Sequence, residues 1–329
     1  MSSSSAHRGG LFRSSSSSAS ASASASRRQL RSSCLASSSS SRQHPFSVVF
    51  GGSPSFTVRR SLNHSSGSSS SRYHFLSLSC AASAMMSSES ESTAANSNND
   101  EQQQIKMTRM AEWLKKADAV CFDVDSTVIN TEGIDELADY FGAGEAVAKL
   151  TKEAMEGGMK FEEALDARLK LINPTQQGVD KFMAMHAFPI MPGMRELVVK
   201  LLTSGKQVFL VSGGFRQMIA PVANEIGVPV NKIYANNIMF DEEGKYAGFD
   251  DTEPTSRSGG KAEAVKRIKA SNGFQTVVMV GDGMTDLEAR VEGGADAFIC
   301  FTGVVRRDAV AEGADLAVGE MAQIMDLLL

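Results

Sequence analysis

The chain has 329 residues, of which 42% are hydrophobic and 22% are charged, enough for one sizeable α/β domain with an insertion or for two domains. The net charge of −5 hides a split, because residues 1–88 hold nine Arg and no Asp, Glu or Lys. The remaining residues carry 24 Lys and Arg against 38 Asp and Glu. A mature protein this acidic lacks the positive surface that binds nucleic acid or anionic lipid, so we expect neither as a partner.

Residues 1–88 have the composition of an organelle transit peptide, since they carry arginine and long serine runs but no acidic residue. The high serine content favours the plastid stroma over the mitochondrion as the destination. The alternative is a disordered, low-complexity tail without an address. No apolar run reaches the length of a membrane span, so we expect no membrane partner.

Residues 89–104 are polar and predict a linker, and an amphipathic helix is expected from Ile105 to Lys116. Short apolar strands then alternate with helical patterns. The predicted strands are Ala117–Phe122, Gln207–Val211, Lys232–Ala235, Thr276–Val280 and Ala297–Phe301. The predicted helices cover residues 193–204, 216–226, 260–271, 285–292 and 305–312. This alternation predicts an α/β core over residues 105–133 and 189–329, a doubly wound parallel sheet with helices on both faces.

Two segments interrupt the alternation. Residues 134–188 carry only helical periodicity and predict a helical cap inserted after the first strand. Residues 238–249 hold two short β-prone runs around Glu-Glu-Gly and predict a β-hairpin. Ligands of open α/β sheets bind outside the carboxyl ends of the strands, so a cap inserted there is expected to close the site.

Polar motifs follow the strand ends. The first strand runs into "DVDST", the second into "SGG" and a later one into "GDGMTD", and "SGGK" opens a helix between the last two. The residues that these motifs contribute are Asp123, Asp125, Ser212, Gly213, Gly214, Lys261, Asp282 and Asp286. A single Asp-x-Asp occurs by chance in a chain of this length, so the prediction depends on the four motifs together.

This set of residues suits phosphoryl transfer. Asp123 and Asp282, with the backbone carbonyl of Asp125, offer the oxygen ligands that Mg²⁺ prefers. A carboxylate nucleophile on phosphorus forms an aspartyl-phosphate, and a second carboxylate two residues on can move the proton. Ser212, the Gly213 amide and Lys261 can bind the phosphoryl oxygens, on which charge develops.

The motifs, in this order and spacing, resemble those of the haloacid dehalogenase (HAD) superfamily of phosphohydrolases. "DVDSTVINTEGIDELA", "FLVSGGFR", "YAGFD", "SGGK" and "VGDGMTDLEA" resemble the phosphoserine phosphatase family within it, over about residues 110–328. The resemblance implies a HAD-like fold, with Asp123 as nucleophile and Asp125 as general acid and base. It also implies Mg²⁺ held by Asp123, Asp125 and Asp282.

The substrate-binding residues follow from the same resemblance. Glu132 would meet an ammonium group and Arg168 a carboxylate, while Met155 and Phe161 would line the apolar side. The full predicted set for substrate and phosphate is Glu132, Met155, Phe161, Arg168, Ser212, Gly213, Gly214, Asn236, Lys261, Thr285 and Asp286. Glu156 and Met284 depart from the family pattern, and Glu156 could perturb the cap loop.

Simpler interpretations exist for several of these residues. Glu132 and Arg168 could form surface ion pairs on a cap helix, and Met155 and Phe161 could be ordinary cap core. Asp286 could merely favour the N-terminal dipole of its helix.

The resemblance predicts Mg²⁺-dependent hydrolysis of O-phospho-L-serine, the last step of serine biosynthesis by the phosphorylated route. Alternatives are another small phosphomonoester, phosphotransfer to an alcohol such as homoserine, or a non-catalytic binding module. A homodimer is compatible with the sequence, which does not decide the oligomeric state.

Overall fold

A six-stranded parallel sheet forms the centre of the part of the chain that the computed structural model describes, residues 101–329 without the side chains of residues 154–157. The strand order is β3-β2-β1-β6-β7-β8. The bounds are β1 Ala119–Phe122, β2 Gln207–Phe215, β3 Ile233–Asn236, β6 Val277–Gly281, β7 Ala297–Phe301 and β8 Leu316–Val318. The predicted doubly wound parallel sheet is confirmed.

Strand β1 lies in the middle of the sheet and is buried on both faces. Val120 and Phe122 pack into one apolar cluster, while Ala119 and Cys121 pack into another. Successive side chains of a strand point to opposite faces, so an uninterrupted apolar run is what a strand covered on both sides requires.

Helices cover both faces of the sheet. On the face of Phe122 lie the helix over residues 101–116, α6 (Met194–Thr203), α7 (Arg216–Ile226) and α11 (Met321–Asp326). On the other face lie α8 (Gly260–Asn272), α9 (Met284–Leu287) and α10 (Asp308–Gly313). None of the helices among the described residues has both the length and the apolar character to cross a bilayer.

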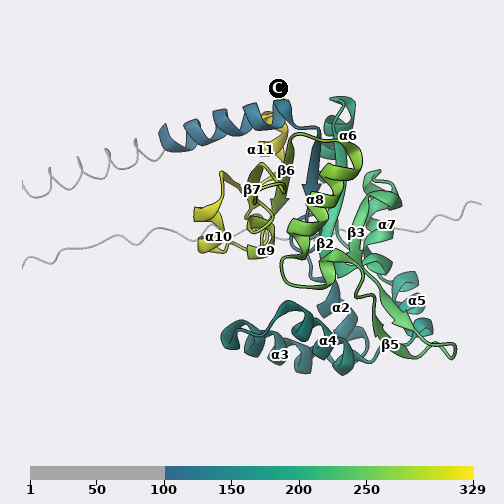
Figure 1. The fold of residues 1–329 in the computed structure, drawn as a ribbon. Coiled ribbons are helices and arrows are strands. Elements are labelled where there is room, and N and C mark those ends of the chain that lie inside the picture. The colour runs from purple at the N-terminus through teal and green to yellow at the C-terminus, as the bar shows by residue number, and fades with distance from the viewer. Residues whose placement is uncertain (1–100) are drawn as a thin grey trace, which may run out of the picture. The chain divides into compact units, whose positions relative to one another are not determined.

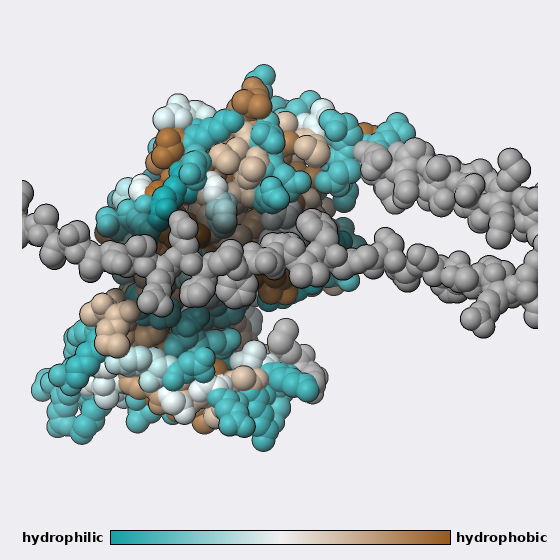
Figure 2. Space-filling view, turned by 180° about the vertical axis from the view of Figure 1, so that it is seen from behind, coloured by the Kyte–Doolittle hydropathy of each residue, from teal (hydrophilic) through white to brown (hydrophobic). Residues whose placement is uncertain are grey.

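Four helices precede the second strand, in the segment predicted as the cap. They are α2 (Gly133–Tyr140), α3 (Gly144–Gly157), α4 (Phe161–Ile172) and α5 (Gln176–Met185). They lie beyond the arrowhead of β1, at the carboxyl end of the sheet (Figure 1). The surface of this helical group that is visible from behind is mostly hydrophilic (Figure 2). We refer to these helices as the cap; the division of the chain into transit peptide, linker, core and cap stays a prediction.

The predicted hairpin is present as antiparallel β4 (Ile238–Phe240) and β5 (Tyr246–Phe249). It reaches the cap, where the backbone N–H of Gln176 donates to the carbonyl of Gly244 at 2.9 Å. Two short 3₁₀ turns, η1 (Val230–Lys232) and η2 (Pro254–Ser256), flank β3 and the hairpin.

Several boundaries differ from those predicted. The first helix reaches back at least to residue 101, into the range expected as linker, and β2 continues through Gly213 and Gly214. Helix α9 ends at Leu287, because the backbone N–H groups from Ala289 on bond to carbonyls only two or three residues back, as Arg290 N does to Leu287 O. Helix α10 begins only at Asp308, after an extended Arg307.

Two short elements at the end of the chain were not predicted. Strand β8 has three residues and α11 has six. Segments this short carry too few residues for a periodic pattern, and both are recognisable only from their packing on β7 and α6.

The core makes a direct prediction about stability. Leu201 of α6 is fully buried, and its replacement by alanine should cost about 2–5 kcal/mol because a cavity remains. The neighbouring Leu202 is 40% exposed, and the same change there should cost less than about 1 kcal/mol. Urea unfolding followed by circular dichroism measures both, and equal losses would contradict the assignment of this face to the core.

Candidate active site

The carboxyl ends of β1, β2 and β6 meet at one edge of the sheet. Phe122 pairs with Leu210 on one side and with Val280 on the other. The residues just beyond these positions are therefore brought level, and the Asp123 N–H donates to the Val280 carbonyl at 2.9 Å. This register gathers motifs that are far apart in the sequence.

Lys261 binds two of the gathered acids. Its Nζ lies 2.9 Å from Asp123 Oδ1 and 2.7 Å from Asp286 Oδ1, and all three residues are buried. Burial by itself lowers the pKa of Lys261, but the two carboxylates outweigh it and raise the pKa. Lys261 therefore stays charged in the buried site.

Asp286 is held in place on both oxygens. Oδ1 accepts from Lys261, and Oδ2 accepts from the Gly283 N–H at 3.0 Å. Its pKa is raised, mainly by burial and then by the Asp123 carboxylate. A side chain at Gly281 would place its first carbon 2.3 Å from Asp286 Cγ. The first glycine of "GDG" is thus required by this close contact, and Asp286 does more than complement a helix dipole.

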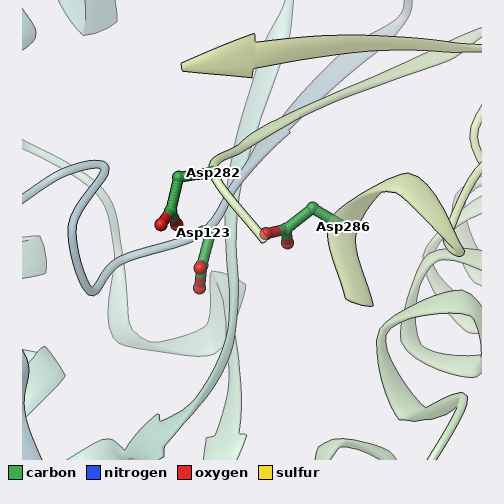
Figure 3. A group of neighbouring side chains, drawn as sticks. All are labelled: Asp123, Asp282 and Asp286. Atoms are coloured by element: carbon green, nitrogen blue, oxygen red, sulfur yellow. The ribbon is translucent and has the colours of Figure 1, made fainter. Parts of the chain in front are cut away.

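Three carboxylates could hold a metal ion together. One oxygen each from Asp123, Asp282 and Asp286 lies within 4.8 Å of the others, and the three side chains face one region (Figure 3). Clustered carboxylate oxygens suit a hard divalent cation. The predicted ligand set included Asp125 through its backbone carbonyl and not Asp286. Metal binding by Asp123, Asp125 and Asp282 stays a prediction, and the structure places Asp286 beside two of them.

Asp125 is held with its carboxyl facing the cavity. Its Oδ1 accepts from the Gly133 N–H at 2.8 Å. Burial, the Glu132 carboxylate and the Asp123 carboxylate raise its pKa to about 7. A first side-chain carbon at Gly214 would lie 2.7 Å from Asp125 Oδ2, so only glycine permits this approach. Near neutral pH the group can therefore both give and take a proton.

Glu132 and Arg168 face the same cavity. Glu132 Oε1 accepts from Ser126 Oγ at 2.7 Å, and burial raises the pKa of Glu132. Arg168 Nε donates to the Ala164 carbonyl at 3.2 Å, and burial lowers its pKa against the opposing charges of Asp135, Glu132 and Asp125. These surroundings do not support the interpretation as surface ion pairs.

The carboxyl end of β2, residues 212–214, is the predicted phosphate-binding loop, and hydrogen bonds hold it from behind the cavity wall. Ser212 Oγ accepts from the Gly214 N–H at 2.9 Å, and Asn236 Nδ2 donates to the Gly213 carbonyl at 2.8 Å. Thr255 Oγ1 donates to the other amide atom of Asn236 at 3.0 Å. Ser212 and Asn236 are fully buried and shape the loop from behind the cavity wall, so a direct contact of either with substrate stays a prediction.

These residues surround a cavity of about 170 Å³. Its lining includes the predicted residues Asp123, Asp125, Glu132, Phe161, Arg168, Gly213, Gly214, Lys261, Asp282, Thr285 and Asp286. Of the predicted cap residues, the side chain of Met155 lies outside the described residues, as does that of Glu156. Met284 is exposed at 45%, away from the lining.

Sequence reasoning missed several lining residues, of which Arg307 matters most. Arg307 forms an ion pair with the Asp282 carboxylate, and its Nη1 donates to the Asp282 carbonyl at 3.2 Å. Two arginines shortly after the β7 end, in an otherwise acidic segment, were a usable signal. Ile134, Leu165 and Phe215, which give one side of the cavity an apolar character, had no signal beyond helix or strand periodicity.

Comparison with known proteins agrees with this geometry. The profile of the haloacid dehalogenase-like hydrolases matches residues 120–289. The chloroplastic phosphoserine phosphatase of Arabidopsis thaliana is 51% identical over 214 residues, which are 65% of this chain and 72% of that protein.

Solved structures agree as well. The structure of DsGPDH of Dunaliella salina matches with a TM-score of 0.59 and 34% identity, over 67% of this chain but only 37% of that one. A phospho-aspartyl intermediate analogue of phosphoserine phosphatase matches with a TM-score of 0.55 and 28% identity, over 64% of this chain and 98% of that one. The chain therefore belongs to the haloacid dehalogenase-like hydrolases and, within them, to the phosphoserine phosphatase family.

Proposed function

We propose that the protein hydrolyses O-phospho-L-serine to L-serine and phosphate, with Mg²⁺ as its cofactor. The observation that carries this proposal is one cavity lined both by Asp123, Asp125 and Lys261 and by Glu132 and Arg168. The first three suit a phosphoryl group, and the last two suit the ammonium and carboxylate of an amino acid. The names of the relatives support the same substrate.

In the first step, an oxygen of the Asp123 carboxylate attacks phosphorus and the bond from phosphorus to the serine oxygen breaks. Asp125 donates its proton to the departing alkoxide, for which its pKa of about 7 is suited. The product is an aspartyl-phosphate on Asp123 and free serine. In the second step, water attacks phosphorus while Asp125 takes its proton, and Asp123 is released with inorganic phosphate.

Charge on the phosphoryl oxygens is countered by groups of this chain. The Lys261 ammonium is already placed beside Asp123, and the Gly213–Gly214 loop and Arg307 line the same cavity. Mg²⁺ would be held by Asp123, Asp282 and the backbone carbonyl of Asp125, with Asp286 nearby. It would supply further neutralisation of the charge that develops in the transition state.

The cap residues would select the substrate. Glu132 accepts an ammonium group, Arg168 pairs with a carboxylate, and Phe161 and Leu165 cover the apolar side. Residues 1–88 would direct the protein to the plastid stroma, as the chloroplastic relative suggests. There the enzyme would complete serine synthesis.

Removing the nucleophile tests the mechanism. Asp123→Asn should lower kcat by at least about 10³-fold, because an amide oxygen is a poor nucleophile toward phosphorus. It should also abolish inhibition by beryllium fluoride, which mimics the phosphoryl group on the aspartate. Phosphate release by the full chain measures both. Wild-type turnover in this variant would contradict the covalent step, and transfer of the phosphoryl group to added homoserine would favour a phosphotransferase.

Metal binding can be tested without turnover. MgCl₂ should stabilise the wild type against thermal unfolding, by about 2.7 kcal/mol when Mg²⁺ is present at 100 times its Kd. Asp282→Asn should lose most of this increment because it removes a ligand oxygen. Glu288→Gln, an exposed change on the same segment, should keep it. Equal increments in the two variants would contradict the assignment of Asp282.

Activity on a substrate without a carboxylate tests the role of Arg168. Arg168→Ala should lower kcat/KM for phosphoserine by about 10- to 100-fold, the value of a hydrogen bond to a charged group. It should change activity on phosphoethanolamine, which has no carboxylate, far less. Lys170→Ala, on the exposed side of the same helix, is the control. Equal losses on both substrates would remove the assigned role.

A further inference from the structure

Ser258 of the core is hydrogen-bonded to the first turn of cap helix α4. Its Oγ accepts from the Phe161 N–H at 3.3 Å and donates to Glu162 Oε2 at 3.0 Å. The Ser258 N–H donates to the same Glu162 oxygen at 3.0 Å. These three bonds join segments almost a hundred residues apart, and Ser258 has no part in the chemistry proposed above.

The first turn of α4 needs partners of this kind. The first N–H groups of a helix lack acceptors within the helix, and a serine hydroxyl is a preferred one. The residue that precedes α4 is Lys160, whose ammonium cannot accept a hydrogen bond. Ser258 supplies the missing acceptor from another part of the chain. The pKa of Glu162 is lowered by backbone N–H groups, first its own and then that of Ser258, which keeps this carboxylate charged.

Both sides of this contact lead directly into the cavity. On the cap side, the Phe161 ring lies against the phosphate-binding loop, since a first side-chain carbon on Gly213 would come within 2.9 Å of its tip. On the core side, Lys261 follows Ser258 by three residues. The intervening turn passes through Gly259 with φ 73° and is closely packed at Gly260, where a side chain would lie 2.1 Å from the Pro254 carbonyl.

We propose that Ser258 and Glu162 form a latch that holds the start of α4 against the core and so positions Phe161 over the phosphate-binding loop. Both are positioning residues. The latch lies on an exposed surface, where each bond has a small net value, so it can open for substrate entry and product release and close again between. The expected effect of the latch on catalysis rests on the proposed phosphatase activity, whereas its expected effect on hydrogen exchange does not.

Hydrogen exchange measures the latch without substrate. In Ser258→Ala and Glu162→Ala the amides of residues 161–165 should exchange at least about fivefold faster than in wild type, since about 1 kcal/mol of hydrogen bonding is lost. Ser258→Thr keeps the hydroxyl and should restore slow exchange. Arg257→Ala, an exposed change next to Ser258, should leave the exchange rates unchanged.

Kinetics on phosphoserine provide the second measurement. Ser258→Ala should raise KM about fivefold and change kcat less than twofold, because the chemical groups are intact and only closure of the cap is weakened. The double variant with Glu162→Ala should be no worse than the stronger single variant, since both remove the same contact.

The latch would be overturned by exchange rates equal to those of wild type in both single variants, or by effects of the two changes that simply add. A fall in kcat with unchanged exchange would also overturn it and assign Ser258 to the placement of Lys261 instead. If the wild-type protein released no phosphate, the proposed function would fail while the exchange measurement still decided the latch.

Discussion

The Lys261 ammonium lies buried between the carboxylates of Asp123 and Asp286, and the rest of the site depends on this contact. Burying one charge alone is prohibitive, and a buried pair is tolerated only with close geometry and further hydrogen bonds. Here two acids share one base, so the group has a negative excess, while the neighbouring Asp282 is paired with Arg307. A site of this kind favours a ligand that brings positive charge, and the Lys261 ammonium orients the Asp123 carboxylate beforehand.

The strand register brings the acidic motifs to one edge of the sheet, and close packing against glycines lets their side chains reach their positions. The parallel pairing of β1 with β2 and β6 brings distant motifs to one edge. Gly214 and Gly281 then let Asp125 and Asp286 approach the backbone more closely than any side chain would allow. The same fold thus places Asp125, whose pKa is raised, and the charged Lys261 within one small cavity.

The sequence predicted the sheet, the hairpin and the core side of the cavity lining, because each depends on a local pattern: an apolar run, a turn signal, or a polar motif at a strand end. Glu132, Phe161 and Arg168 were predicted only from the family resemblance, since no local pattern places a cap residue over the edge of the sheet. Arg307 escaped because it meets Asp282 only through tertiary packing, from a segment whose helical pattern suggested an earlier helix start. The Ser258–Glu162 contact escaped for the same reason, since no local pattern relates a loop serine to a helix end formed by distant residues. Strand β8 was too short to carry a pattern.

The central position of β1 also bears on how the chain reaches its native state. One edge of β1 pairs with β2, whereas the other waits for β6, and the adjoining contact between Asp118 and Gln275 spans 157 positions. During synthesis, the apolar residues of β1 therefore emerge early and are paired on both edges only late. Unpaired apolar edges of this kind promote aggregation, and contacts so distant in sequence slow folding. The arrangement that unites the catalytic groups makes the nascent chain dependent on protection until its last third has arrived.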